Sequence, residues 1–83
     1  MPQLTVKFFA AAADAAGTRE AEVAVPEGSA LRDVLAAARE QYPAAASVIE
    51  QSAVFIQNRH EPNLDRPVEG LSAIDVLPPF AGG

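Results

Sequence analysis

Cysteine is absent from this 83-residue sequence. Neither a disulfide framework nor a thiolate metal site can therefore form, and any sulfur chemistry must use sulfur supplied by another molecule. The sequence also lacks the basic start and long apolar stretch of a secretory signal, and no run approaches the roughly 18 apolar residues of a membrane span. We therefore expect a cytoplasmic protein with no membrane partner.

Basic residues are few: five Arg and one Lys are scattered among eleven acidic residues, for a formal charge of −5. This balance repels a phosphate backbone, so nucleic acid is not an expected partner. An acidic surface instead favours encounter with a basic face on a partner protein.

The length predicts one domain, residues 1–83, with a modest core, because a chain of this size buries only about 60% of its extended surface. Alternation of apolar and polar residues predicts strands separated by turn residues, the first two of them forming a hairpin. The expected strands are residues 4–9, 20–25, 53–57 and 73–77.

One main helix is expected from about Ala30 to Gln41 or Tyr42, with Ser29 as its N-cap and Pro43 beyond its end. Residues 10–16 are interpreted as a connector, and residues 44–51 as either a short helical turn or a loop. Strands on both sides of a single long helix predict an α+β domain in which that helix covers one face of a mixed sheet.

The polar turn after the third strand, around Asn58 and Arg59, contains the one histidine, His60. No partners for a metal site or a catalytic triad stand at useful spacing, so His60 is assigned to a surface loop. Asn58 is interpreted as a turn residue that tolerates left-handed geometry. We expect no catalytic residue and no metal ligand on this chain.

The sequence ends Leu77-Pro78-Pro79-Phe80-Ala81-Gly82-Gly83. Two prolines favour an extended path, which predicts a flexible tail, residues 78–83, that projects from the domain. Gly82 and Gly83 have no Cβ and can pass through a narrow channel. The terminal carboxylate is an anion at neutral pH and a poor electrophile, so a partner would have to activate it, most simply as a mixed anhydride with a nucleotide phosphate.

The whole chain resembles MoaD-type proteins, the small subunits of molybdopterin synthase, within the ubiquitin-like sulfur carriers that include ThiS. The resemblance rests on five segments. They are Val6-Lys7-Phe8-Phe9-Ala10, Gly17, Tyr42-Pro43, Phe55-Ile56-Gln57-Asn58 and the Pro-Pro-Phe-Ala-Gly-Gly ending. It departs from the family at residues 69–75, where the usual Gly-Asp-Glu turn before the last strand is absent.

The resemblance implies a β-grasp fold and a carrier that is not an enzyme by itself. An E1-like (MoeB-like) enzyme would use ATP and Mg²⁺ to adenylate Gly83, which a sulfur donor enzyme would help convert to a thiocarboxylate. The carrier itself would bind no cofactor. The large synthase subunit (MoaE-like) would hold the catalytic residues and receive the tail, with Pro79, Phe80, Ala81 and Gly82 threaded toward its active site.

Three alternatives remain open at this point. The sulfur acceptor could belong to another pathway, such as thiazole, tRNA thiolation or cysteine synthesis. Gly83 could instead form an isopeptide bond as a protein modifier. The domain could also be a β-grasp interaction module without covalent chemistry.

Overall fold

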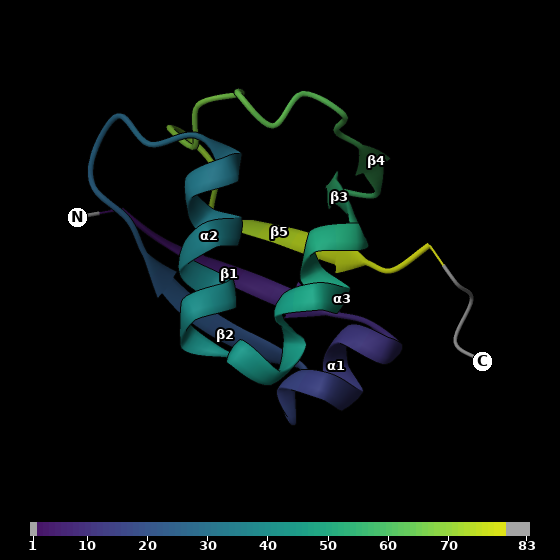
Figure 1. Cartoon of the computed structure of the whole chain (residues 1–83). Coiled ribbons are helices and arrows are strands. Elements are labelled where there is room, and N and C mark those ends of the chain that lie inside the picture. Colours follow the sequence, from purple (N-terminus) through teal and green to yellow (C-terminus); the bar gives the residue numbers. More distant parts are fainter. Residues whose placement is uncertain (1, 80–83) are drawn as a thin grey trace.

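A computed structural model describes residues 2–79 as a five-stranded mixed sheet with its helices on one face (Figure 1). The order across the sheet is β2-β1-β5-β3-β4. The strands are β1 (Gln3–Phe8), β2 (Glu20–Ala24), β3 (Ala53–Ile56), β4 (Arg59–His60) and β5 (Ala73–Leu77). The predicted mixed sheet is confirmed, and four of the five strands were predicted to within two residues at each end.

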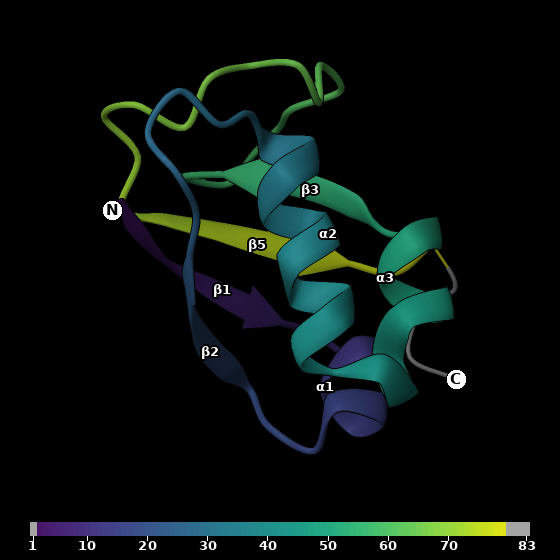
Figure 2. The same cartoon turned by 60° about the vertical axis from the view of Figure 1, so that its left-hand side comes forward.

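The centre of the sheet joins the two ends of the chain. β1 pairs antiparallel with β2, as the predicted hairpin requires, and parallel with β5, with Lys7 opposite both Glu20 and Asp75. Figure 2 shows β1 and β5 side by side, running in the same direction. β5 is an interior strand that is paired on both sides. The position at which the chain leaves the sheet, after Leu77, is therefore fixed.

The helical layer contains more than the one predicted helix. It comprises α1 (Ala11–Ala16), α2 (Leu31–Gln41), the 3₁₀ turn η1 (Pro43–Ala45) and α3 (Ala46–Gln51). The main helix, α2, is confirmed to within a residue, but residues 10–16 are not merely a connector. Gly17 ends α1 with a φ of 76°. A helix this short is unstable alone and forms here because Ala12 is fully buried against the core.

The prediction that Ser29 caps α2 is wrong, because Ala30 is the N-cap residue. The carboxylate of Asp33 accepts a hydrogen bond of 2.8 Å from the Ala30 amide. The next amides, of Leu31 and Arg32, donate to carbonyls of the distant segment 61–68. That segment replaces a local serine cap, which periodicity along the chain cannot reveal.

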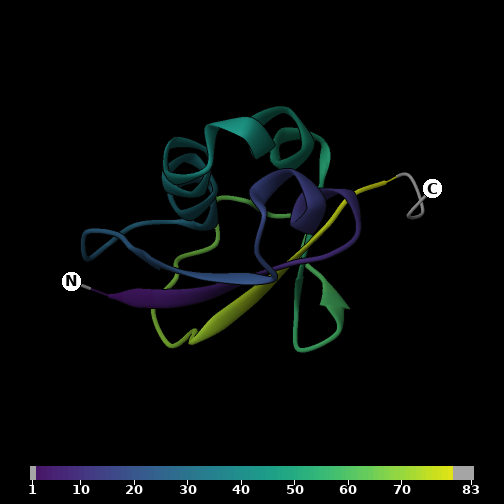
Figure 3. The ribbon, with the colours of Figure 1, turned by 90° about the horizontal axis from the view of Figure 1, so that it is seen from below.

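The core lies between the sheet and the helices (Figure 3). Alternate strand residues supply one side of it, and the buried face of α2 supplies the other. Phe8 meets Tyr42 edge-on at a ring-centroid distance of 5.5 Å. The largest fully buried side chains are Leu4, Leu31, Ile49, Ile74, Val6, Val23, Val25, Val34, Val54 and Val76.

The turn after β3 lies one residue earlier than predicted. Gln57 and Asn58 both have positive φ, 50° and 67°, as a two-residue hairpin of type I′ requires. This confirms the left-handed geometry expected at Asn58. The loop assignment of His60 is wrong, since Arg59 and His60 form β4. Both remain exposed.

The long connection from β4 to β5 is held by a few local contacts. Val68 is buried and anchors the connection to the core. Arg66 donates a hydrogen bond of 3.0 Å to the Glu61 carboxylate. This guanidinium and the Asn63 amide hold the pKa of Glu61 below its ordinary value, because both stabilise the charged carboxylate. Among the described helices, none is long and apolar enough to cross a membrane.

Candidate functional site: the open face of the sheet

The face of the sheet opposite the helices is uncovered by any described element (Figure 3). One cross-strand row passes over all five strands on this face, because the pairing registers align. The row reads Glu20, Lys7, Asp75, Phe55 and His60 from β2 to β4. Asp75 thus occupies the middle of the row, between Lys7 and the aromatic side chain of Phe55.

An apolar hollow of about 240 Å³ lies where β5 ends, and Phe9, Phe55 and Leu77 form its apolar walls. Phe9 is the large apolar side chain that the described residues leave most exposed, at 43%. Asn58 and Asp75 complete the lining. We call these five residues the open-face hollow. The three phenylalanines near this site do not share one face of the sheet. Phe8 is buried in the core, whereas Phe9 and Phe55 line the open-face hollow.

A second hollow of about 290 Å³ adjoins the open-face hollow and shares Asn58 and Asp75 with it. Lys7 and Gln57 also line this second hollow. The two hollows together form a trough along β5, with its apolar end where the chain leaves the sheet. The adjacent turn keeps two non-glycine residues in left-handed geometry, a conformation for which glycine has less strain.

Of the residues predicted to enter a partner, the structure describes only Pro79. Pro79 is described and exposed, two residues after Leu77, where β5 ends. Phe80, Ala81, Gly82 and Gly83 lie outside the described residues, so their predicted roles stay predictions.

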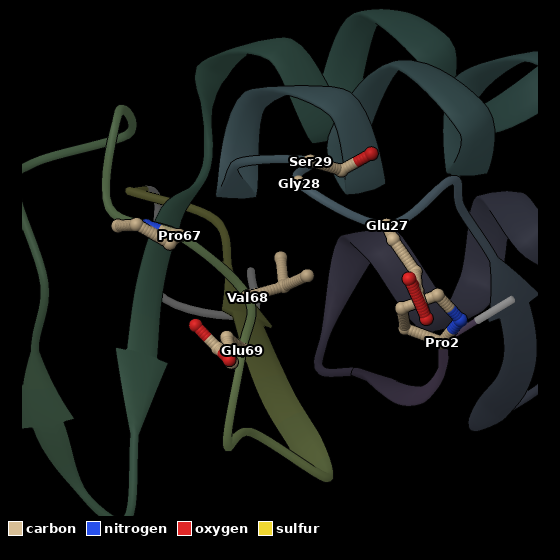
Figure 4. Close-up of a pocket in the computed structure, with 7 residues that line it drawn as sticks. All are labelled: Pro2, Glu27, Gly28, Ser29, Pro67, Val68 and Glu69. Carbon is tan, nitrogen blue, oxygen red and sulfur yellow. The ribbon is translucent and has the colours of Figure 1, made fainter.

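A separate pocket of about 320 Å³ lies at the end of the sheet where β5 begins (Figure 4). Pro2, Pro67 and Val68 give it apolar walls, and Glu27 and Glu69 stand at its sides. Buried Ser29 is the one hydroxyl in this lining, and the single histidine is on β4 at the far side of the sheet. No serine–histidine pair can form there.

No group of three or more His, Asp or Glu side chains within residues 2–79 is placed to hold a metal ion. His60 instead lies 5.3 Å from Phe55 between ring centroids, with the rings tilted by 37°. Its position suits a surface contact rather than coordination.

The sequence matches the model of one protein family over most of its length. The model of the ThiS family matches residues 6–83. The chain belongs to the ThiS family. The matched segment includes all of α1–α3, β2–β5 and the terminal glycines.

Solved structures confirm that this ThiS-family chain has the ubiquitin-like β-grasp fold. The small archaeal modifier protein 1 of Haloferax volcanii superposes with a TM-score of 0.85 at 23% identity, over 99% of this chain and 100% of that one. Its namesake from Methanosarcina acetivorans reaches 0.79 at 27% identity, over 100% and 98%.

A third neighbour is a complex of subunits 1 and 2 of the molybdopterin-converting factor from Helicobacter pylori. Its TM-score is 0.69 at 20% identity, over 99% of this chain and 100% of that one. Modifier proteins and a subunit of the molybdopterin-converting factor thus both occur among chains with this fold. The likeness establishes the architecture, while the chemistry has to be argued from the residues.

Reasoning from the sequence missed the row that includes Asp75. The alternation within residues 73–77 does place Asp75 and Leu77 on the same side of a strand, opposite the buried Ile74 and Val76. Which residues of other strands lie beside them depends on registers that the sequence pattern does not specify.

Proposed function

We propose that this chain is a sulfur carrier whose working group is the α-carboxylate of Gly83, and that it serves as the small subunit of a molybdopterin synthase. The observation that carries the proposal is the position of the open-face hollow at the end of β5. A partner that docks there is adjacent to the segment that leads through Pro78 and Pro79 to the terminal glycines.

The chemistry proceeds in two balanced steps. The Gly83 carboxylate attacks the α-phosphorus of ATP, which forms an acyl-adenylate and releases pyrophosphate. A sulfide equivalent then attacks the acyl carbon, the bond to AMP breaks, and a thiocarboxylate remains. The activating enzyme would supply the Mg²⁺ site and the ATP site. The large synthase subunit would then supply the side chains that catalyse sulfur transfer.

Intact-mass spectrometry tests this proposal. The chain is incubated with ATP, Mg²⁺, the E1-like enzyme of its own genome and sulfide. We expect the mass gained when sulfur replaces one oxygen, and no gain when ATP is omitted. A variant without Gly82 and Gly83 is the matched control, and we expect it to gain no sulfur at a nearly unchanged melting temperature. An unmodified wild-type mass in the complete mixture would refute sulfur carriage.

A second candidate is protein modification, favoured by the similarity to two small archaeal modifier proteins. The adenylated Gly83 would then react with a lysine amine of another protein, forming an isopeptide bond as AMP leaves. Lysine-linked conjugates in the same mixture, supplemented with cell extract, would support this function. The thiocarboxylate form is also mixed with the large synthase subunit and the pterin precursor. Loss of sulfur from the carrier in this mixture would support the synthase function over protein modification, because only the synthase consumes the sulfur.

A further inference from the structure

We propose that Asp75 selects the docking partner by forming an ion pair with an arginine side chain that the partner protein inserts into the open-face hollow. The inference rests on the proposed function, because it names the chemistry of the protein surface that docks beside the tail. The inference is based on the surroundings of the Asp75 carboxylate.

Asp75 occupies the middle of β5, the central strand of the sheet, and is half-buried. Its neighbours on the open face are Lys7 on one side and Phe55 on the other. Its side chain lines both hollows of the trough. Within residues 2–79 the Asp75 carboxylate accepts no hydrogen bond and makes no ion pair.

Water solvates this carboxylate while the face is open. A partner that covers the apolar walls of Phe9, Phe55 and Leu77 removes that water, and an unpaired buried carboxylate is costly. The covering surface must therefore bring a cation or strong donors to Asp75. A purely apolar surface would fit the walls but would leave the charge buried.

Arginine suits the hollow better than lysine does. Its planar guanidinium can donate two parallel hydrogen bonds to one carboxylate and can stack on an aromatic ring. Phe9 and Phe55 line the same hollow as Asp75 and offer those rings. The net charge of −5 also favours approach of a basic partner.

Lys7 is the nearest cation along the row but stands between two carboxylates, because its cross-strand neighbours are Glu20 and Asp75. No ion pair joins Lys7 to either of them. When an arginine engages Asp75, the Lys7 ammonium can face Glu20 instead. The row thus accommodates the added charge without placing two cations on one carboxylate.

The test measures adenylation by the E1-like enzyme used above, as pyrophosphate released at varied carrier concentration. We expect Asp75→Asn to raise the KM for the carrier about tenfold or more, with kcat nearly unchanged. Asp14→Asn is the matched control, because Asp14 is an exposed aspartate on α1, and its KM should equal that of the wild type. Equal KM values for the two variants would overturn the proposal.

The variant Asp75→Leu distinguishes whether the partner inserts a cationic or an apolar side chain into the hollow. An inserted arginine predicts a raised KM, whereas an inserted apolar side chain predicts a lowered one, which would also overturn the proposal. Circular dichroism confirms that each variant is folded before its KM is read.

A second readout does not depend on adenylation, so it separates failure of this inference from failure of the proposed function. Arginine amide is titrated into the isotope-labelled full chain, with citrulline amide as the neutral control. We expect amide shifts at Phe9, Phe55 and Asp75 with arginine amide only, and their loss in Asp75→Asn. Equal shifts with both compounds would count against an arginine site.

Discussion

Ala10→Gly should stabilise the protein, although glycine replacements usually destabilise. Ala10 has φ 51° and ψ −126°, at the junction between β1 and α1. A side chain with a Cβ is strained in this region, whereas glycine adopts it freely. Ala10 is exposed, so removal of its methyl group reduces the buried apolar area only slightly.

The size of the effect follows from two opposing terms. Release of the strain contributes about 1–3 kcal/mol. The greater freedom of glycine in the unfolded chain costs about 0.4–1 kcal/mol. We therefore expect a net gain of about 1 kcal/mol in the free energy of unfolding, which corresponds to a melting temperature about 4–8 °C higher for a domain of this length.

Urea denaturation followed by far-ultraviolet circular dichroism measures this gain as a higher midpoint at unchanged slope. Ala24→Gly is the matched control, because Ala24 is also exposed but lies in regular β2 geometry. It should lose about 0.5–1 kcal/mol. If Ala10→Gly destabilises as much as Ala24→Gly does, the reasoning about strain at the β1–α1 junction is refuted.

Two further changes test the core and the connection from β4 to β5. Leu4→Ala removes a fully buried side chain and should cost about 2–5 kcal/mol in urea denaturation; a loss below about 1 kcal/mol would contradict its place in the core. Glu61→Gln removes the carboxylate charge that pairs with the Arg66 guanidinium. Since the folded pKa of Glu61 is lowered, its stabilising effect is present above the unfolded pKa and is lost as pH falls through the folded one. The melting temperatures of variant and wild type should therefore differ slightly at neutral pH and converge in acid; a constant difference would argue against the pair.

Local patterns in the sequence were sufficient for much of the fold. Strict alternation predicted β1, β2, β3 and β5, because one side of each strand is buried and the other is not. Pro43 marked the end of α2, because a proline disfavours helical geometry in the residue before it. These signals act over a few residues, so they can be read without knowing the three-dimensional neighbours.

Other elements exist only because distant segments meet. β4 has two residues and is defined by its pairing with β3. α1 has six residues and depends on burial of Ala12. The amides of Leu31 and Arg32 at the start of α2 donate to the carbonyls of Arg66 and Leu64, which are 35 and 32 residues away (66 − 31 and 64 − 32). These contacts take the place of the predicted cap at Ser29. No local propensity carries this information.

The candidate site, too, depends partly on the local sequence and partly on the tertiary structure. The prediction that Gly83 is the working group came from the sequence alone, because it rests on the order of residues 78–83, on side-chain size and on the chemistry of a carboxylate. Only the tertiary structure showed which side chains lie around Leu77, where the chain leaves the sheet. Asp75, Phe55 and Lys7 lie on one surface because of the registers of two strand pairs, β1–β5 and β3–β5, and strand register is set by packing across the whole sheet.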